Sequence, residues 1–510
     1  MADGRRGGPG GEPRDRDGGA MSRRGSVAPL AQALDNAGLL AGRQGVLPER
    51  IAGLTDDSRA VVRGGAFVAV RGTQRDGHAF LDAAAQAGAA LAIVEEASAT
   101  SLPALLVRDG RRAAAVVATA YYHEPASRLR LVGVTGTNGK TTTVGMLRHL
   151  LDGPGACAAS IGTLGVLVGS AGEPLPGGGG LTTPGPIELQ RLLRALVDAG
   201  VKSVAMEASS HALDQGRVEG LRFAAAVFTN LTRDHLDYHQ SFEAYFRAKA
   251  LLVGCLTGEG VLVSNADDSA WKQLPTTPRH LTFAVQAAGA DVRAEGVTYH
   301  PRGSRWTLVH GAHRAEVALP LIGDFNVANA LAAAAAAIAV GLDVVTVADR
   351  LGTLPQVPGR LEILSEHPIV LRDYAHTPDA LERALLALRP FTPARLIVLF
   401  GCGGDRDKGK RPMMAEVAHR LADAVVVTSD NPRTEDPERI LDDICAALPA
   451  GGYERIEDRR TAIAAAIAMA DPSRDVVLLA GKGHETYQIR GTTSYPFDEA
   501  AIVRGLLGTG

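Results

Sequence analysis

A glycine-rich turn carries the strongest chemical signal in the sequence. The segment Thr135-Gly-Thr-Asn-Gly-Lys-Thr-Thr142 follows a short apolar run and precedes a helical pattern. Backbone N–H groups of such a turn can surround a phosphate, and a helix N-terminus attracts negative charge. Lys140 can reach the β- and γ-phosphates, and the Thr141 hydroxyl can bind Mg²⁺. The strict G-x4-G-K-[ST] spacing is not met, because Val134 stands where its first glycine belongs. The turn therefore predicts a shorter phosphate loop, and the lack of an N-K-x-D motif argues against a GTPase.

Lysine is rare in this chain, so each lysine is a candidate for a specific role. Only seven of the 53 Lys and Arg residues are lysines. An ammonium suits a compact phosphate contact or chemistry at an amine better than a guanidinium does. Lys249 lies within the apolar helical pattern of 242–252. If Lys249 were at the surface, its aliphatic chain would lie along the helix and its ammonium would reach the solvent. If it were buried, its pKa would fall, and the free amine could take up CO₂ as a carbamate. The sequence leaves both readings open.

Two further polar segments follow predicted strands. Glu207 belongs to Met206-Glu-Ala-Ser-Ser-His211, and His235 belongs to Asn230-Leu-Thr-Arg-Asp-His-Leu-Asp-Tyr-His239. Open parallel sheets bind ligands beyond the carboxyl ends of their strands. Mg²⁺ prefers carboxylate and phosphate oxygens, so Glu207 is the natural second metal ligand beside the phosphate loop. Imidazole is not the usual ligand of Mg²⁺, and each histidine alone could be an ordinary hydrogen-bonded residue.

Apolar runs alternate with helical patterns along most of the chain, which predicts an α/β fold with parallel sheets. A chain of 510 residues allows about three domains. Strand-like runs stand at 66–70, 90–94, 129–134, 201–206, 224–229, 260–263, 369–372, 396–400, 424–428 and 476–480. We expect a disordered tail and three domains, over residues 1–26, 27–128, 129–357 and 358–510.

The composition argues against several classes of protein. A content of 46% hydrophobic and 21% charged residues is typical of folded domains. The formal net charge of −3 argues against a nucleic-acid-binding protein. No run of 18 apolar residues is present, so we expect no membrane span, and the Ala-rich stretch 330–342 predicts a buried helix. The four cysteines lack the spacing of a zinc cluster or disulfide framework, and no secretory segment is visible. We therefore expect a cytoplasmic protein.

Together these motifs resemble those of the Mur ligase family, which builds the peptide of peptidoglycan. The last third of the chain strengthens the resemblance with four more segments: Asp373-Tyr-Ala-His-Thr-Pro-Asp379, Gly401-Cys-Gly-Gly-Asp-Arg-Asp-Lys-Gly-Lys-Arg411, Asp430-Asn-Pro-Arg433 and Gly481-Lys-Gly-His-Glu485. These are similar to the branch that adds diaminopimelate to UDP-N-acetylmuramoyl-L-alanyl-D-glutamate (enzyme class 6.3.2.13). The resemblance covers residues 28–508, with the motifs in family order.

The resemblance implies an N-terminal nucleotide-sugar domain, a central P-loop-type ATPase domain and a C-terminal Rossmann-like domain. It also implies an ATP-dependent amide ligase that works through an acyl phosphate. The implied catalytic residues are Lys140, Glu207, His235 and Lys249. The implied ATP-binding residues are Gly136, Thr137, Asn138, Gly139, Lys140, Thr141, Thr142, Asn326, Asn329, Arg360 and Asp373. Two Mg²⁺ ions would be held by Thr141, Glu207, His235 and Lys249, the last as N6-carboxylysine. The two asparagines at 326 and 329 could instead cap a helix.

Two further sets of residues are implied to bind the other substrates. The UDP-N-acetylmuramoyl dipeptide would contact Ser58, Thr73, Gln74, Thr182, Thr183, Ser209, Gln215 and Arg217. Diaminopimelate would contact Arg406, Asp430, Asn431, Pro432, Arg433, Gly481 and Glu485. The far end of diaminopimelate carries a carboxylate that suits Arg433 and an ammonium that suits Glu485. Lysine lacks that carboxylate and would leave the arginine unpaired. Taken alone, the D-N-P-R segment could be a β-turn with a surface arginine.

The sequence is also compatible with other functions. A lysine-adding Mur ligase or a folylpolyglutamate synthase would share the chemistry, although Arg433 and the S-S-H-A-L segment argue against both. A P-loop ATPase acting as a switch would hydrolyse ATP without an amino acid. A nucleotide-sugar-binding protein would catalyse nothing. We expect a monomer.

Overall fold

The computed structural model describes residues 25–72, 75–155, 157–178 and 180–508. Thr73 and Gln74, which we expected at the sugar site, lie outside these residues, as does most of the predicted tail. The chain divides between His123 and Glu124 into two compact units. The boundaries of the three expected domains remain predictions.

The first unit is a five-stranded sheet with helices. Its strands are parallel except for β2, which runs antiparallel to β7. In sheet order they are β2 (Leu40–Gln44), β7 (Ala104–Val107), β6 (Leu91–Val94), β5 (Ala66–Val68) and β4 (Leu54–Thr55). The helices are α1 (Val27–Asn36), α2 (Leu81–Gln86) and α3 (Gly110–Tyr121), and a short ladder joins β1 (Gly25–Ser26) to β3 (Arg50–Ile51).

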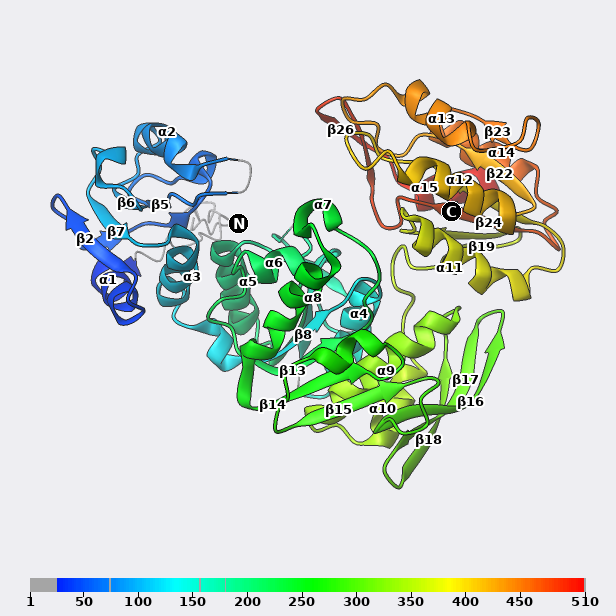
Figure 1. The fold of residues 1–510 in the computed structure, drawn as a ribbon, viewed down its shortest axis with the longest axis horizontal. Helices are drawn as coiled ribbons and strands as arrows, with labels where there is room; N and C mark the ends of the chain where they lie inside the picture. The colour runs from blue at the N-terminus through cyan, green and yellow to red at the C-terminus, as the bar shows by residue number, and fades with distance from the viewer. Residues whose placement is uncertain (1–24, 73–74, 156, 179, 509–510) are drawn as a thin grey trace, which may run out of the picture. The chain divides into compact units, whose positions relative to one another are not determined.

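An eleven-stranded sheet forms the first half of the second unit (Figure 1). Its centre is parallel, as predicted, but antiparallel hairpins extend it at both edges. In sheet order the strands are β11 (Glu173–Leu175), β10 (Gly165–Val168), β9 (Ala158–Gly162), β12 (Ser203–Glu207), β8 (Arg130–Thr135), β13 (Phe223–Phe228), β14 (Leu256–Asn265), β15 (His280–Ala284), β16 (Val292–His300), β17 (Gly303–His310) and β18 (His313–Leu319).

The helices of this half include the predicted alanine-rich one. Helix α9 (Asp324–Ala339) packs against α4 (Lys140–Leu151), and its residues 330–337 are all buried. A helix that is apolar all round belongs in a core, so the prediction is confirmed for residues 330–337; the helix ends at Ala339, and residues 340–342 lie beyond it. The remaining helices are α5 (Pro186–Asp198), α6 (Ser210–Asp214), α7 (Leu236–His239), α8 (Phe242–Ala250) and α10 (Val344–Leu351). Within the described residues, no helix combines the length and the apolar character that a bilayer crossing requires.

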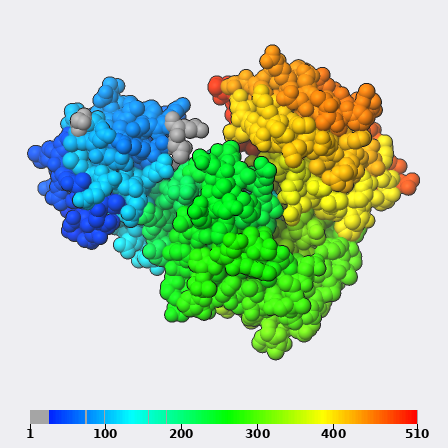
Figure 2. Space-filling model, in the orientation of Figure 1, coloured from blue at the N-terminus to red at the C-terminus, as the bar shows by residue number. Residues whose placement is uncertain are grey.

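A six-stranded sheet organises the last third, which gathers into one mass in the space-filling view (yellow to red, Figure 2). Only its edge strand β19 is antiparallel. In sheet order the strands are β19 (Glu362–Glu366), β20 (Ile369–Asp373), β24 (Val476–Ala480), β21 (Leu396–Phe400), β22 (Ala424–Val427) and β23 (Glu454–Arg455). Around it stand α11 (Pro378–Leu388), α12 (Lys410–Leu421), α13 (Pro437–Cys445), α14 (Arg459–Ala468), α15 (Glu499–Leu507) and the hairpin of β25 (Tyr487–Arg490) and β26 (Thr493–Pro496).

The order of these strands decides where the predicted motifs meet. The three neighbouring strands β24, β21 and β22 run parallel, and each is followed directly by one motif of the expected amino-acid site. The segments 401–411, 430–433 and 481–485 therefore start from one edge of the sheet, where α/β proteins bind ligands.

Candidate active site

The predicted phosphate loop joins β8 to α4, and close packing explains both of its glycines. Gly136 and Gly139 have φ angles of 147° and 83°. A Cβ atom at Gly136 would lie 1.9 Å from Thr229 Oγ1, and one at Gly139 would lie 2.2 Å from Asn329 Oδ1. The loop is also tied to the end of β13, because Thr229 Oγ1 donates to the Asn138 carbonyl oxygen at 2.7 Å. Only glycine fits these backbone angles and close approaches without strain.

The lysine of the loop folds back onto it. Lys140 Nζ donates to the carbonyl oxygens of Gly136 at 3.0 Å and Thr137 at 2.8 Å. Burial of the ammonium lowers the pKa of Lys140 below its usual value, although the Glu207 carboxylate opposes this shift. The ammonium thus sits on the loop, where phosphate oxygens could replace the two carbonyl acceptors.

Glu207 lies beside the loop, as the strand order predicts. It ends β12 and is fully buried, with its two oxygens accepting hydrogen bonds from different donors. Oε1 accepts from the Thr163 backbone N–H at 2.7 Å, and Oε2 accepts from Thr141 Oγ1 at 3.2 Å. Arg360 Nη2 donates to the same Thr141 hydroxyl at 3.1 Å. A carboxylate and a hydroxyl at hydrogen-bonding distance form a hard oxygen pair that suits Mg²⁺.

Lys249 is buried, which excludes the surface reading of this residue. Its Nζ donates to the Gly136 carbonyl oxygen at 2.7 Å and lies 4.4 Å from the centre of the Tyr245 ring. Burial, and then the charge of Lys140, hold the pKa of Lys249 well below its usual value. The structure thus favours a neutral amine here, the form that can react with CO₂.

His235 approaches the same tyrosine, with its ring centre 6.3 Å from that of Tyr245. Its side chain is half-exposed, and burial lowers its pKa below the usual value for histidine. Within the described ranges, no three His, Cys, Asp or Glu side chains form a metal-binding group. A metal near His235 therefore needs further oxygen donors, which a phosphate or a carbamate on Lys249 could supply.

Side chains from α9 and the last third also reach the loop. Asn326 Nδ2 donates to the Ile322 carbonyl oxygen at 2.7 Å, and Asn329 Nδ2 donates to Asn326 Oδ1 at 3.2 Å. Neither asparagine is the N-cap of α9, which is Gly323. Asn138 Nδ2 donates to Asp379 Oδ2 at 3.1 Å.

Two predicted ATP contacts, Arg360 and Asp373, come from the last third of the chain. Arg360 stacks over the Tyr374 ring at 4.7 Å, and Asp373 accepts from the Leu361 backbone N–H at 2.7 Å. Of the predicted nucleotide residues outside the loop, Arg360 contacts Thr141 and Asn329 lies against Gly139, whereas Asp373 bonds the residue after Arg360.

The residues expected to hold the muramoyl peptide form a connected group next to Glu207. Thr183 Oγ1 donates to the Glu207 carbonyl oxygen at 2.8 Å and accepts from the Ser209 backbone N–H at 3.1 Å. Arg217 Nη1 donates to the Thr183 carbonyl oxygen at 3.0 Å, and its Nη2 donates to Gln215 Oε1 at 2.6 Å. The hydroxyls of Thr182 and Thr163 lie 3.2 Å apart. Ser58 belongs to the first unit, where it opens a short 3-10 helix, Ser58–Ala60.

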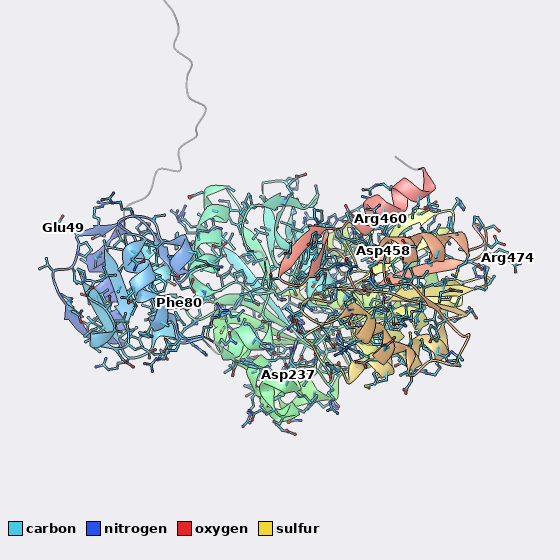
Figure 3. All side chains as sticks on the ribbon, turned by 90° about the horizontal axis from the view of Figure 1, so that it is seen from above. Glu49, Phe80, Asp237, Asp458, Arg460 and Arg474 are labelled. Carbon is cyan, nitrogen blue, oxygen red and sulfur yellow. The ribbon has the colours of Figure 1, made fainter. Side chains whose placement is uncertain are left out.

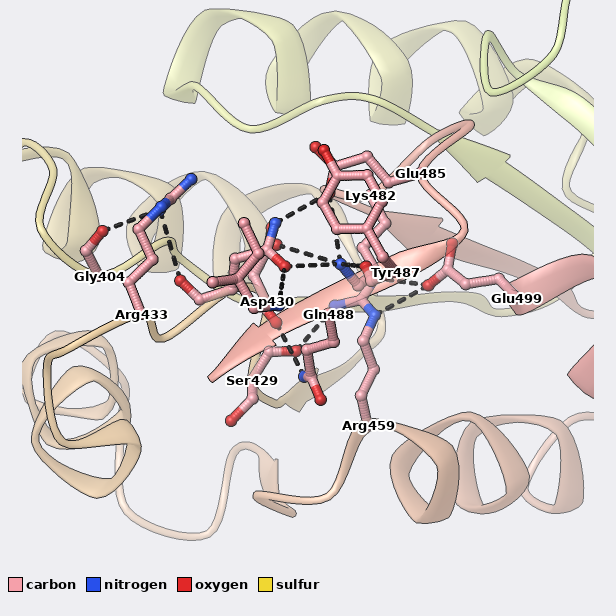
Figure 4. Close-up of polar contacts among 12 residues, drawn as sticks. Gly404, Ser429, Asp430, Arg433, Arg459, Lys482, Glu485, Tyr487, Gln488 and Glu499 are labelled. Atoms are coloured by element: carbon pink, nitrogen blue, oxygen red, sulfur yellow. Dashed lines mark hydrogen bonds and ion pairs between the residues drawn. The ribbon is translucent and has the colours of Figure 1, made fainter. Parts of the chain in front are cut away.

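The turn Asp430–Arg433 is held in an unusual conformation. Arg433 has a φ of 54°, a region that favours glycine. Its backbone N–H donates to the Ile489 carbonyl oxygen at 3.1 Å, and its own carbonyl accepts from the Gly491 N–H at 2.6 Å. Its Nη1 donates to the Gly404 carbonyl oxygen at 2.9 Å (Figure 4). Strain of this kind, held by surrounding bonds, is typical of functional sites. Arg406, by contrast, has an exposed side chain.

A buried polar network behind this turn was not predicted. Lys482 Nζ donates to Asn431 Oδ1 at 3.0 Å, to the Tyr487 carbonyl oxygen at 2.7 Å and to Glu485 Oε2 at 3.3 Å. Deeper still, Arg459 pairs with Glu499 at 2.8 Å, and both are fully buried (Figure 4). The scarcity of lysine could have identified Lys482, but nothing in the sequence pattern marks residues 459 and 499 as partners.

Three family profiles match the chain in order. They are the catalytic domain of the Mur ligase family at residues 50–129, the Mur ligase middle domain at 134–337 and the Mur ligase glutamate ligase domain at 359–483. The curated relatives include UDP-N-acetylmuramoyl-L-alanyl-D-glutamate–2,6-diaminopimelate ligases of two organisms. The one from Gloeobacter violaceus is 46% identical, over 90% of this chain and 94% of the relative. The one from Geobacillus thermodenitrificans is 44% identical, over 89% and 94%.

Solved structures agree with this assignment. A structure of a UDP-N-acetylmuramoyl-L-alanyl-D-glutamate–2,6-diaminopimelate ligase has a TM-score of 0.62 and 34% identity, over 90% of this chain and 95% of the other. MurF from Acinetobacter baumannii shares the fold, with a TM-score of 0.66 at 19% identity, over 95% and 99%. Given the three family profiles and the near-complete coverage of relatives more than 40% identical, the chain belongs to the Mur ligase family.

Proposed function

We propose that this protein is the ATP-dependent ligase that joins diaminopimelate to UDP-N-acetylmuramoyl-L-alanyl-D-glutamate in the synthesis of cell wall precursors. The observation that carries the proposal is 46% identity to a ligase of that name, over nine tenths of the chain. The site supports it, because a phosphate loop, a buried carboxylate and the Asp430–Arg433 turn all belong to one unit. These are the parts that such a ligase needs.

The first step activates the D-glutamyl side-chain carboxylate, which is a poor acylating agent by itself. A carboxylate oxygen attacks the γ-phosphorus of ATP, the bond to the β,γ-bridging oxygen breaks, and an acyl phosphate and ADP form. Two anions must approach each other, so positive charge and fixed hydrogen-bond donors provide most of the catalysis. Lys140 and Arg360 contribute that charge, and the N-terminus of α4 adds its dipole.

The second step transfers the acyl group to an amine. The neutral amine of diaminopimelate attacks the acyl carbon, and the tetrahedral intermediate collapses to the amide as the C–O bond to phosphate breaks; the amine gives up one proton, and the phosphate leaves as hydrogen phosphate. Arg433 can hold the far carboxylate of this substrate, because its Nε and Nη2 groups bond no other described residue. A planar guanidinium with free N–H groups binds a carboxylate in a bidentate manner. Lysine as substrate would offer no such partner.

Mg²⁺ fits the proposed site. Thr141 and Glu207 would hold one ion together with phosphate oxygens, and His235 with carbamylated Lys249 would hold a second. When bound, the ions neutralise phosphate charge and orient the reacting groups. The support for the modification is the burial of Lys249 and its lowered pKa.

We further propose that the enzyme acts as a monomer in the cytoplasm and binds no nucleic acid. The near-neutral net charge of −3 argues against nucleic-acid binding. The location rests on the substrates, because ATP and a UDP-sugar are cytoplasmic metabolites. Light scattering of the purified protein gives the mass directly, and a dimer mass would contradict the first part of this proposal.

One assay tests the function. The purified protein is incubated with Mg-ATP, the UDP-muramoyl dipeptide and diaminopimelate, and phosphate release and product mass are measured while each component is omitted in turn. We expect release only with all three. Replacement of diaminopimelate by lysine tests the alternative, a lysine-adding ligase of the same family. Equal nucleotide turnover without the dipeptide or the amino acid would refute both readings.

A further inference from the structure

Lys482 is a buried cation that has no donor left for a substrate. Its side chain is fully buried, and an ammonium group carries three N–H donors. All three have protein acceptors, namely Asn431 Oδ1 at 3.0 Å, the Tyr487 carbonyl oxygen at 2.7 Å and Glu485 Oε2 at 3.3 Å. Whatever Lys482 does for the reaction, it must therefore do through these neighbours.

Two of those neighbours belong to the predicted diaminopimelate site. The Asn431 side chain is fixed from three directions, since its Oδ1 also accepts from the Ile489 N–H at 3.0 Å and its Nδ2 donates to Glu485 Oε2 at 2.8 Å. Glu485 Oε2 thus receives bonds from both Asn431 and Lys482. Among the described residues, Glu485 Oε1 accepts no hydrogen bond. One oxygen of the carboxylate is held, and the other stays available for a ligand.

The charges of the cluster agree with this arrangement. Lys482 lies 3.8 Å from Asp430 Oδ1 and 3.3 Å from Glu485 Oε2, so one buried cation faces two carboxylates. Without Lys482, these two anions would be left close together in a poorly hydrated place, which costs free energy. An ammonium arriving from a substrate would add a second positive charge beside these two carboxylates.

We propose that Lys482 is a positioning residue for substrate specificity. It fixes Asn431 and the Glu485 carboxylate so that Glu485 Oε1 receives the far ammonium of the amino-acid substrate, while Arg433 on the same turn receives the far carboxylate. This inference rests on the proposed function, and it gives a role to a residue that touches no substrate. One buried cation thereby holds the Glu485 carboxylate and the side chain of Asn431, which lies on the same turn as Arg433.

The test is the kinetic behaviour of Lys482→Met, which keeps the length of the side chain and removes the charge and the donors. We expect the KM for diaminopimelate to rise about 10- to 100-fold, as for the loss of a hydrogen bond to a charged group. The KM values for ATP and the UDP-muramoyl dipeptide should stay within about twofold, because hydrogen bonds of the cluster do not reach the phosphate loop. Lys482→Gln, which retains two donors, should recover part of the loss. If Lys482→Met does not fold, Lys482→Gln serves for the same comparison of the three KM values.

A double-mutant cycle separates positioning from general destabilisation. Glu485→Gln alone should raise the diaminopimelate KM, and adding Lys482→Met to it should raise the KM little further, because both changes act on the same carboxylate. Independent, multiplying effects would overturn the proposal, as would equal rises of all three KM values. Failure of the wild-type protein to release phosphate with diaminopimelate would instead refute the proposed function, so the two failures are distinguishable.

Discussion

The buried pair of Arg459 and Glu499 offers a sharp test of how the last third is held together. Both side chains are 0% exposed, and Arg459 Nε donates to Glu499 Oε1 at 2.8 Å. The other two nitrogens of the guanidinium donate to the carbonyl oxygens of Ala480 at 2.9 Å and Ser429 at 3.3 Å. One side chain thus links the ends of β22 and β24, directly before the two motifs of the proposed amino-acid site. The neighbouring Asp458 and Arg460 are exposed (labelled in Figure 3).

The size of the effect follows from what each substitution leaves behind. Arg459→Met leaves the buried Glu499 carboxylate without its ion-pair partner. It also removes the hydrogen-bond donors to the carbonyl oxygens of Ala480 and Ser429. Breaking a buried ion pair from one side costs about 3–5 kcal/mol. The double variant Arg459→Met, Glu499→Leu removes the stranded charge as well. Only the two carbonyl groups are then affected, which costs about 1–3 kcal/mol. The double variant should therefore be more stable than the single one by about 2 kcal/mol.

Urea denaturation at pH 7, followed by a probe in the last third, measures these differences. Arg460→Met is the matched control, because this exposed neighbour should change the free energy of unfolding by no more than about 0.5 kcal/mol. We also expect Arg459→Met to raise the KM for diaminopimelate, since both motifs would lose a common anchor. The reasoning is refuted if the single variant is as stable as the double variant, or as stable as the control.

Three other predictions concern the site. Lys249→Ala should lower the ligation rate at least about 100-fold, and acetate or formate should restore part of it. The control Lys272→Ala, at an exposed lysine, should keep the wild-type rate. A fully active Lys249→Ala would remove the carbamate from the mechanism. Arg433→Ala should raise the KM for diaminopimelate about 100-fold and leave the KM for ATP unchanged. The control Arg439→Ala, at an exposed arginine, should change neither constant. Parallel rises in both constants would argue against a role of Arg433 in specificity. Burial lowers the pKa of His484 to about 4, so its neutral form is favoured in the folded state and its stabilising contribution is lost as the pH falls from about 6.5 to 4. His484→Asn should reduce the slope of the free energy of unfolding against pH in that window by at most about 1.4 kcal/mol per pH unit. Urea titrations at several pH values measure this slope, and an unchanged slope would contradict the lowered pKa of His484.

The parts of the fold that the sequence predicts well are those with a local signal. The runs at 396–400 and 476–480 match β21 and β24 at both ends, because continuous apolar stretches define buried parallel strands. The phosphate loop also follows from local rules, since its glycines and following helix need no distant partner to be recognised. The sequence does not predict the antiparallel hairpins at the edges of the large sheet, because β16 to β18 carry polar residues throughout and lack the continuous apolar run that marks a buried strand.

The candidate site divides in the same way. The burial of Lys249 could not be read from its helix, since the apolar neighbours allow both a surface and a core position; packing against Gly136 decides it. The bond of Lys482 to Asn431 and the pair Arg459–Glu499 join residues 51 and 40 positions apart, which no local pattern encodes. The sequence thus predicts candidate residues for the chemistry, but not the residues that hold them in place.

The distribution of lysines has a practical consequence. Lys202, Lys272 and Lys408 are exposed, whereas Lys249 and Lys482 are buried. An amine-acylating reagent will therefore label the first three in the native protein and reach the other two only when the structure around them opens. Peptide mass spectrometry after brief labelling would then report separately on the opening of the nucleotide side and of the amino-acid side, without any engineered probe.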